Sequence, residues 1–308
     1  MQKRRFGRTG LELSVLGFGA GAVGGLMTKG APADQERALA RAIDLGINYV
    51  DTAALYGNGA SEENLGRVLA TLKPNVIVST KVRLPAERNI DAIAASLETS
   101  LRRLKRDHVD LFQLHNPLVA KDADDRLDVE IALNEVVPAL HKLQKAGKTR
   151  FIGFSGVGQT PALLKAIDSR AFDTVQVVYN ALNPSAGGPM PAGVAGQDYG
   201  NLLKRAADKN VGTIIIRALA GGAMAGTEAR HELAMQVVPP IGSGKDFAAD
   251  VARARAMEAA MRASGSSSLA EYGMRFVISN PNVHTMLVGY STIDQLEQAA
   301  KAVNKGAL

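Results

Sequence analysis

Three ionisable residues of different types, Asp51, Lys81 and His115, each end an apolar stretch of β-forming residues. Tyr56 follows the first of them in a loop rich in glycine and asparagine. The carboxyl ends of parallel strands converge on one face of an α/β fold, and catalytic groups lie on the loops that leave that face. A carboxylate, an ammonium, an imidazole and a phenol that meet there could exchange protons with a bound substrate. We therefore predict that the four side chains share one site.

Each of these residues also has a structural interpretation when it is considered alone. Asp51 could stabilise a turn, and Tyr56 could pack on the surface. Lys81 could extend its ammonium from a strand end into water, and His115 could be a hydrogen-bonded histidine at the turn before a proline. Chance placement at three successive strand ends is the weaker explanation, so the combination favours a functional site.

Apolar strands alternate with amphipathic helices along the whole chain, which is typical of a parallel sheet covered by helices. Eight strand–helix units in about 300 residues favour a closed α/β barrel, the (β/α)8 or TIM barrel, over an open doubly wound sheet. We expect one domain over residues 1–308. The predicted strands cover residues 14–19, 47–51, 76–81, 109–115, 151–155, 174–180, 212–217 and 285–289. The predicted helices cover residues 33–45, 61–71, 89–105, 128–146, 160–168, 199–209, 246–263, 268–279 and 292–303.

Local signals add three expectations to this frame. Residues 4–6 and 11–13 flank the turn sequence Gly-Arg-Thr-Gly, which predicts an N-terminal hairpin, and the C-terminal half carries one extra helix. Ser61 precedes a helical pattern and is the predicted N-cap. The Gly/Pro-rich loops 183–198 and 220–245 would lie on the catalytic side of a barrel, as a substrate rim or lid.

The composition excludes several kinds of site. The 308-residue chain has no cysteine, so it forms no disulfide, uses no thiolate and binds no metal through cysteine. Its formal net charge of +6 comes from scattered Lys and Arg residues, which favours solvated faces over a nucleic-acid surface and suits an anionic cofactor. No apolar run approaches the ~20 residues that cross a bilayer, and the basic N-terminus lacks a convincing secretion signal. We therefore expect a cytoplasmic protein without membrane or nucleic-acid partners.

Residues 19–24, Gly-Ala-Gly-Ala-Val-Gly, match the G-x-G-x-x-G spacing of dinucleotide-binding folds. That motif needs its last glycine in the first turn of a helix, so that the helix N-terminus meets the pyrophosphate. Here residues 25–32 intervene before the next predicted helix. We interpret the glycines as letting the loop after the first strand pass close to a cofactor or substrate, and we do not predict a Rossmann domain.

The sequence around the four candidate groups resembles the aldo-keto reductase family. The matching motifs stand in the order and strand context of that family's Asp, Tyr, Lys, His tetrad. They are Asp51-Thr52-Ala53 with Tyr56-Gly57, Ser79-Thr80-Lys81, and Gln113-Leu114-His115. The resemblance covers nearly the whole chain, including the hairpin and the segment Gly153-Phe154-Ser155, and the Arg217 segment and the loops look most like bacterial sugar-type members. It implies a barrel that binds an extended nicotinamide dinucleotide across its mouth.

The resemblance assigns a role to each member of the tetrad. Tyr56 would be the general acid in carbonyl reduction and, as phenolate, the base in the reverse direction; a free phenol titrates near ~10, which is high for catalysis near neutrality. The buried ammonium of Lys81 would stabilise the phenolate, and Asp51 would keep that ammonium charged. His115 would hydrogen-bond the carbonyl oxygen, orient it and stabilise its developing charge.

The resemblance also implies a site for NADP(H) or NAD(H). Ser155 and Gln176 would hold the nicotinamide carboxamide. Arg217 and Leu219 lie in the segment where many members place an aromatic residue against the nicotinamide, and Arg217 would contact the cofactor through its plane or charge instead. The adenosine-phosphate end would lie at a helix N-terminus, bound by Gly289, Ser291 and Gln295.

Two departures from the family pattern leave NAD(H) as an alternative cofactor to NADP(H). No basic residue stands near Ser291, and Ala299 stands where the family usually has asparagine. The main hypothesis is an oxidoreductase that moves hydride between a nicotinamide and a small-molecule carbonyl, namely an aldehyde, ketone or sugar. The alternatives are a cofactor-binding redox sensor without turnover and a Schiff-base or metal-dependent barrel lyase using Lys81, although Tyr56 has no obvious role in a lyase. The sequence does not indicate the oligomeric state.

Overall fold

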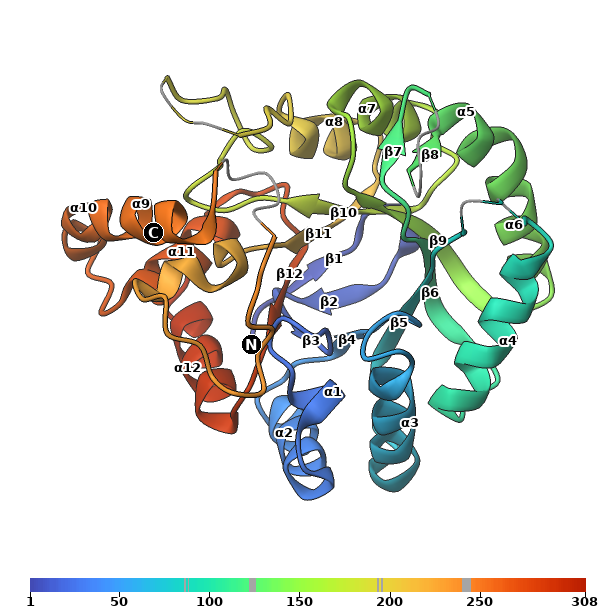
Figure 1. Cartoon of the computed structure of the whole chain (residues 1–308), viewed down its shortest axis with the longest axis horizontal. Coiled ribbons are helices and arrows are strands. Elements are labelled where there is room, and N and C mark those ends of the chain that lie inside the picture. The colour runs from blue at the N-terminus through green and yellow to red at the C-terminus, as the bar shows by residue number, and fades with distance from the viewer. Residues whose placement is uncertain (86, 88, 122–125, 193, 195, 240–244) are drawn as a thin grey trace.

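The chain forms a closed barrel of parallel strands surrounded by helices (Figure 1). The computed structural model describes residues 1–85, 87, 89–121, 126–192, 194, 196–239 and 245–308. Within these residues the barrel strands pair in chain order, and the last pairs with the first to close the ring, which confirms the predicted (β/α)8 barrel. The barrel strands are β3 (Leu16–Gly19), β4 (Tyr49–Asp51), β5 (Ile77–Val82), β6 (Val109–Leu114), β9 (Thr149–Gly156), β10 (Thr174–Val178), β11 (Gly212–Ile216) and β12 (Thr285–Gly289).

Helices form between the strands because those segments carry apolar residues at helical spacing. In α4, for example, Ile93, Leu97, Leu101 and Leu104 are all buried in the main core. Among the helices of the described ranges, none has both the length and the apolar character that crossing a bilayer requires. The helices are α1 (Leu26–Lys29), α2 (Pro32–Asp44), α3 (Ala60–Leu72), α4 (Ala92–Leu104), α5 (Val129–Ile131), α6 (Val137–Lys145), α7 (Thr160–Asp168), α8 (Leu202–Asp208), α9 (Phe247–Ala256), α10 (Glu258–Ala263), α11 (Leu269–Ser279) and α12 (Ile293–Asn304), with a 3-10 turn at Ala220–Ala225.

The segment predicted as one helix over residues 128–146 consists of α5 and α6 joined by a π-helical turn at Ala132–Val136. Pro138 lies in the first turn of α6 and has no N–H, so a regular α-helical hydrogen-bond ladder cannot run through it. Three short elements were absent from the sequence-based prediction. They are α1 and the parallel pair β7 (Leu118–Val119) and β8 (Leu127–Asp128).

Helix α3 begins earlier than predicted. Its N-cap is Gly59, with a φ of 96°, and its first helical residue is Ala60. The Ser61 hydroxyl instead donates to the Ala20 carbonyl oxygen (2.8 Å) and hydrogen-bonds the Thr52 hydroxyl (2.7 Å). The N-cap prediction for Ser61 is therefore wrong, because its hydroxyl has partners from distant parts of the chain. It joins the loop after β3 to the loop after β4.

The N-terminal hairpin is confirmed and closes the amino end of the barrel. Strands β1 (Lys3–Arg5) and β2 (Glu12–Ser14) are antiparallel, and a 3-10 turn at Gly7–Thr9 connects them. Phe6 is buried, and its ring lies so close to the start of β11 that a Cβ on Gly212 would be 2.6 Å from it. The cluster beneath the hairpin contains Phe6, Leu13, Tyr49, Leu111 and Ile214. A ligand therefore has to approach the barrel from its carboxyl end.

Arg4 anchors this hairpin, because its guanidinium donates to the carbonyl oxygens of Ile278 (2.7 Å), Asn280 (3.2 Å) and Val283 (2.5 Å). Arg4→Ala should lower the free energy of unfolding by about 2 kcal/mol, since part-buried carbonyls lose a charged donor. Urea denaturation followed by circular dichroism measures the change. Arg5→Ala, at the exposed neighbouring position, is the control, and equal losses in both variants would contradict the prediction.

Candidate active site

The four candidate catalytic side chains lie at three adjacent strand ends. Asp51 is the last residue of β4, Lys81 lies near the carboxyl end of β5, and His115 directly follows β6. Strand β5 pairs with both β4 and β6, so the three strand ends are neighbours. Tyr56 lies in the glycine-rich loop between β4 and α3, where its N–H donates to the Ala53 carbonyl oxygen (3.0 Å). The fold thus brings the four predicted residues together.

The Lys81 ammonium lies at the centre of the site. Its Nζ is 2.5 Å from Asp51 Oδ2, 2.8 Å from the Thr52 carbonyl oxygen and 3.2 Å from Tyr56 OH. An ammonium has three protons, so each of them has an acceptor here. The side chain is fully buried, and these hydrogen bonds replace the water that the charge has lost. Because Tyr56 OH accepts from Lys81, its own proton is available to another acceptor.

Two opposing effects set the charge of Lys81. Burial alone would lower the pKa of the ammonium, because water no longer solvates it. The Asp51 carboxylate and Tyr56 favour the charged form, and together they raise the pKa of Lys81 above its ordinary value. Lys81 is therefore an ammonium at neutral pH, and it stabilises negative charge on the adjacent phenol oxygen.

His115 faces Tyr56 across the same site. Their ring centroids are 5.9 Å apart, and the ring planes meet at 83°. Burial, followed by the charges of Lys81 and Arg83, lowers the pKa of His115 to about 3. At physiological pH the imidazole is neutral, so one ring nitrogen donates and the other accepts. The buried Nδ1 has no hydrogen-bond partner in the part of the chain that the structure describes.

A layer of buried polar side chains lies beneath the tetrad and was missed in the sequence analysis. It contains Tyr49, Ser79 and Gln113, each two positions before one of the residues Asp51, Lys81 and His115. Residues two apart along a strand lie on the same face. This spacing, together with the polar character of the three side chains inside apolar runs, is a sequence signal that could have found them.

The two residues expected to hold a nicotinamide carboxamide, Ser155 and Gln176, are paired in register on β9 and β10. Both are buried. Ser155 Oγ has no hydrogen-bond partner among the described residues, which is unusual for a buried hydroxyl and fits a polar group of a ligand. Gln176 Nε2 donates to Asp51 Oδ1 (3.0 Å), so Gln176 also contacts the tetrad directly.

Arg217 and Leu219 lie just after β11, which ends one residue earlier than predicted, and their environments differ. The Arg217 guanidinium donates to the Pro239 carbonyl oxygen (3.0 Å). Burial lowers the pKa of Arg217, while electrostatic interactions with Tyr56 and Tyr199 act in the opposite direction. Leu219 is half-buried and packs between two hydrophobic core clusters. Arg217 therefore adds positive potential near Tyr56, whereas Leu219 contributes packing.

Gly289, Ser291 and Gln295 lie where β12 passes into α12. Thr292 caps the helix by accepting from the Gln295 N–H (3.3 Å), and Gln295 Oε1 accepts from the N–H of Ser291, the residue before the cap (2.8 Å). The Ser291 hydroxyl donates to the Gly24 carbonyl oxygen (2.6 Å). Gly289 is exposed. Ser291 and Gln295 therefore shape the start of α12 and connect it to the loop after β3.

The glycine-rich loop after β3 packs tightly against this helix start. A Cβ on Gly24 would lie 2.2 Å from Tyr290 N, and a Cβ on Gly25 would lie 1.8 Å from the Leu233 carbonyl oxygen, so only glycine fits at either position. The expected close approach is present, but these two glycines approach protein backbone. The motif belongs to the wall of the barrel and not to a Rossmann domain.

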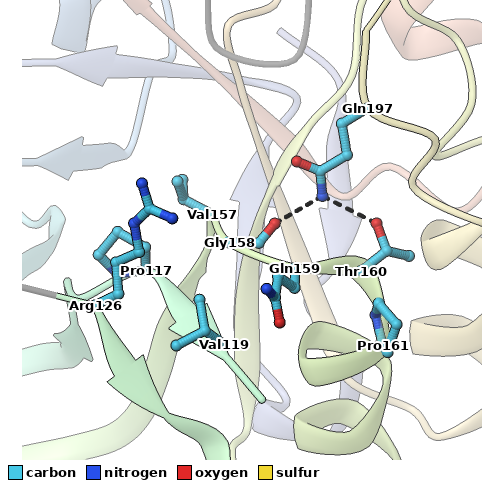
Figure 2. Close-up of a pocket in the computed structure, with 9 residues that line it drawn as sticks. All are labelled: Pro117, Val119, Arg126, Val157, Gly158, Gln159, Thr160, Pro161 and Gln197. Carbon is cyan, nitrogen blue, oxygen red and sulfur yellow. Dashed lines mark hydrogen bonds between the residues drawn. The ribbon is translucent and has the colours of Figure 1, made fainter. Parts of the chain in front are cut away.

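A surface pocket of about 580 Å³ lies at the carboxyl ends of β6 and β9 (Figure 2). Its wall includes Pro117 and Val157, which come from the loops that continue these two strands. Arg126 and Gln197 lie on opposite sides of the pocket in Figure 2. No acidic side chain lines it among the described residues, so the pocket favours ligands rich in acceptor oxygens.

The two long loops follow β10 and β11, so they leave the same carboxyl end of the barrel as the tetrad. Gln197 of the loop 183–198 contributes to the pocket. Residues 193 and 195 of that loop, and residues 240–244 of the loop 220–245, lie outside the described residues.

The sequence matches known proteins over most of its length. The model of the Aldo/keto reductase family matches residues 15–308. L-galactose dehydrogenase of Arabidopsis thaliana is 29% identical over 311 residues, which cover 99% of this chain and 89% of that protein. D-threo-aldose 1-dehydrogenase of a Pseudomonas species is 33% identical over 215 residues, which cover 59% of this chain and 63% of that protein.

Solved structures share the same fold. The holo form of the aldo-keto reductase AKR11C1 from Bacillus halodurans has a TM-score of 0.74 and 22% identity, and the match covers 100% of this chain and 92% of that one. An aldo/keto reductase from Klebsiella pneumoniae, in complex with NADP and acetate, has a TM-score of 0.70 and 25% identity, over 100% and 91% of the two chains. These matches agree with the resemblance carried by the tetrad motifs.

The low pKa of His115 predicts a loss of stability in acid. In the unfolded chain the imidazole has its ordinary pKa of ~6.5, whereas in the folded chain its pKa is about 3. The unfolded chain therefore binds the proton at higher pH, and the free energy of unfolding falls as the pH drops from the first value to the second. From about pH 7 to about pH 5, the wild type should lose about 2 kcal/mol more than His115→Gln, which has no imidazole to protonate. Urea titrations at both pH values measure this. Equal losses would contradict the prediction.

Proposed function

The chain belongs to the aldo/keto reductase family, and we propose from this premise that it interconverts a small-molecule carbonyl and the corresponding alcohol with NADP(H) or NAD(H). The observation that carries the proposal is the hydrogen bond from Lys81 Nζ to Tyr56 OH (3.2 Å). A phenol oxygen that accepts a hydrogen bond from a buried ammonium directs its own proton elsewhere. Tyr56 is thereby suited to protonate a carbonyl oxygen and, in the reverse direction, to remove the alcohol proton.

His115 supports this reaction as a neutral hydrogen-bonding group. Its pKa of about 3 means that the imidazole does not compete with Tyr56 as an acid near neutral pH. A neutral imidazole N–H beside Tyr56 would donate to the carbonyl oxygen, orient it and stabilise the charge that develops on it. Lys81 and Arg217 add positive charge around the same oxygen.

The residues at the mouth of the barrel fit a nicotinamide dinucleotide. Ser155 Oγ lacks a partner among the described residues, and Gln176 lies beside it, so the two would hold the carboxamide. Arg217 and Leu219 would flank the nicotinamide. The bound cofactor would supply or accept the hydride. The adenosine-phosphate end would lie at Gly289, Ser291 and Gln295, at the start of α12, where the positive end of the helix dipole favours phosphate.

The comparisons support a hydroxylated substrate and NADP(H). The names of two relatives specify L-galactose and D-threo-aldose as substrates, and a related structure contains NADP. The acid-free pocket beside β6 and β9 would accommodate the part of a sugar that extends beyond its carbonyl. NAD(H) stays in the proposal because no basic residue lies next to Ser291 in the sequence.

The alternatives have weaker support. A Schiff-base lyase needs a neutral amine at Lys81, whereas this ammonium has three acceptors and a raised pKa. A redox sensor would use the same cofactor site without turnover, so measurement of turnover separates it from the proposed enzyme.

Tyr56→Phe should lower turnover by about 10² to 10⁴, because the proton donor is lost. Binding of NADPH and NADH, each measured by fluorescence titration, should remain within about twofold of the wild type, since the phenol oxygen does not hold the cofactor in this proposal. Tyr272→Phe, on α11, is the control. Near-normal turnover of Tyr56→Phe would show that Tyr56 is not the acid. Absence of binding of either cofactor by the wild type would contradict the proposed function.

Val157→Phe should fill part of the pocket beside β6 and β9. The KM for an aldose should rise roughly tenfold because the extended part of the substrate loses space, whereas the KM for a small aldehyde should not change. Steady-state kinetics with the two substrates measure the difference. Leu308→Phe, which places the same ring on an exposed position outside the two rim loops, is the control. Parallel changes for both substrates would rule out this pocket as the binding place.

A further inference from the structure

The Asp51 carboxylate is held from two sides. Its Oδ2 bonds the Lys81 ammonium (2.5 Å). Its Oδ1 accepts hydrogen bonds from three neutral side chains on other strands: Ser79 Oγ (2.6 Å), Gln176 Nε2 (3.0 Å) and Gln113 Nε2 (3.2 Å). With both oxygens engaged, the carboxylate has one preferred orientation.

We propose that Ser79 and Tyr49 are positioning residues for the proposed reaction, which fix the Asp51 carboxylate so that Lys81 stays aligned with Tyr56. Neither residue would contact the substrate. The inference rests on the proposed function, because it adds two residues to the same catalytic apparatus. Ser79 has the shortest contact to Oδ1, and Tyr49 is the partner of Ser79.

The direction of these hydrogen bonds follows from the charge on Asp51. An ionised carboxylate only accepts, so Ser79 directs its single hydroxyl proton to Oδ1. Ser79 Oγ then accepts from Tyr49 OH, 2.8 Å away, and Tyr49 OH also lies 3.4 Å from Asp51 Oδ1 itself, so the phenol donates toward the carboxylate from the same side. Burial and the nearby Asp51 carboxylate raise the pKa of Tyr49 well above its ordinary value, so its phenol remains a donor. Successive hydrogen bonds that point in the same direction polarise and strengthen each other where the dielectric constant is low.

Water cannot replace these donors. Tyr49, Ser79 and Gln113 are each 0% exposed, and Asp51 is 3% exposed. The Tyr49 ring is also held in the cluster beneath the hairpin, the cluster that contains Phe6. Removal of the Ser79 hydroxyl would leave Oδ1 short of its closest donor, and the carboxylate would shift relative to Lys81.

Thr80 provides a matched control in the same strand. It follows Ser79 directly, so its side chain lies on the opposite face of β5. Its buried hydroxyl donates to another buried carboxylate, Glu62 Oε1 (2.6 Å). Thr80→Val therefore removes a comparable buried hydrogen bond to a carboxylate without changing any contact of Asp51.

The test compares the pH dependence of kcat, at saturating cofactor, for the wild type, Ser79→Ala, Tyr49→Phe and Thr80→Val. In carbonyl reduction, turnover is lost at alkaline pH when the coupled pair of Tyr56 and Lys81 releases a proton, and a weaker contact between Lys81 and Asp51 makes that release easier. Ser79→Ala should therefore move the alkaline limb down by about one pH unit and lower kcat about tenfold. Tyr49→Phe should move the limb in the same direction by less, and Thr80→Val should leave it in place.

The charged and titratable groups that face Lys81 remain unchanged in all three variants. They are Asp51 on β4, Tyr56 in the following loop and His115 after β6, with Arg217 near Tyr56. A shift of the alkaline limb therefore reports the orientation of Asp51. If Ser79→Ala does not fold, the comparison uses Tyr49→Phe: a smaller downward shift of its alkaline limb supports the inference, and an unchanged limb overturns it.

Proton release by Lys81 is also measured directly, by NMR of protein labelled with ¹³Cε-lysine, with the Lys81 signal assigned from Lys81→Arg. This readout needs no turnover, so an inactive wild type would refute the proposed function while the positioning of Lys81 would still be tested. The inference is supported if Lys81 loses its proton at lower pH in Ser79→Ala than in Thr80→Val. It is overturned if Ser79→Ala matches the wild type, or if Thr80→Val shifts as much as Ser79→Ala.

Discussion

A buried ammonium has to be matched by a buried carboxylate, and this requirement organises the mouth of the barrel. Removal of two charges from water is costly, and their attraction offsets the cost only when the remaining hydrogen-bonding capacity is also satisfied. All three protons of the Lys81 ammonium have an acceptor. The Asp51 carboxylate accepts hydrogen bonds from side chains on β5, β6 and β10. Gln176 reaches Asp51 from the opposite part of the strand order, so only a closed ring of strands completes this network.

The same ion pair determines the protonation states that the reaction needs. Lys81 remains charged because Asp51 and Tyr56 outweigh the effect of burial. That charge, together with desolvation, keeps His115 neutral. The site thus contains one fixed cation, one neutral imidazole and one phenol whose proton can be donated to a substrate. This division of roles favours transfer of a single proton, from Tyr56, to an oxygen held between Tyr56 and His115.

The barrel and its tetrad could be predicted because each rests on a short-range pattern. Apolar runs mark the strands, helical spacing marks the covering helices, and an ionisable residue at a strand end marks the site. Ser61 shows where such reasoning fails: its local context favours an N-cap, but Ala20 and Thr52 compete for its hydroxyl through contacts across the fold. The contact between Gln176 and Asp51 spans 125 positions of the chain and depends on barrel closure, which no local pattern encodes.

The N-terminal hairpin has a consequence for how the protein is made. Arg4 has its partners at Ile278, Asn280 and Val283, and Arg8 pairs with Asp173, so the hairpin has no docking site until these much later residues have been synthesised. Strand β3 likewise cannot form its pairing with β12, which closes the ring, until β12 has been synthesised. Domains generally fold as units during synthesis, and unpaired strand edges favour aggregation. Phe6, whose ring packs against Gly212 and His284, therefore lacks its native contacts until those residues have been synthesised.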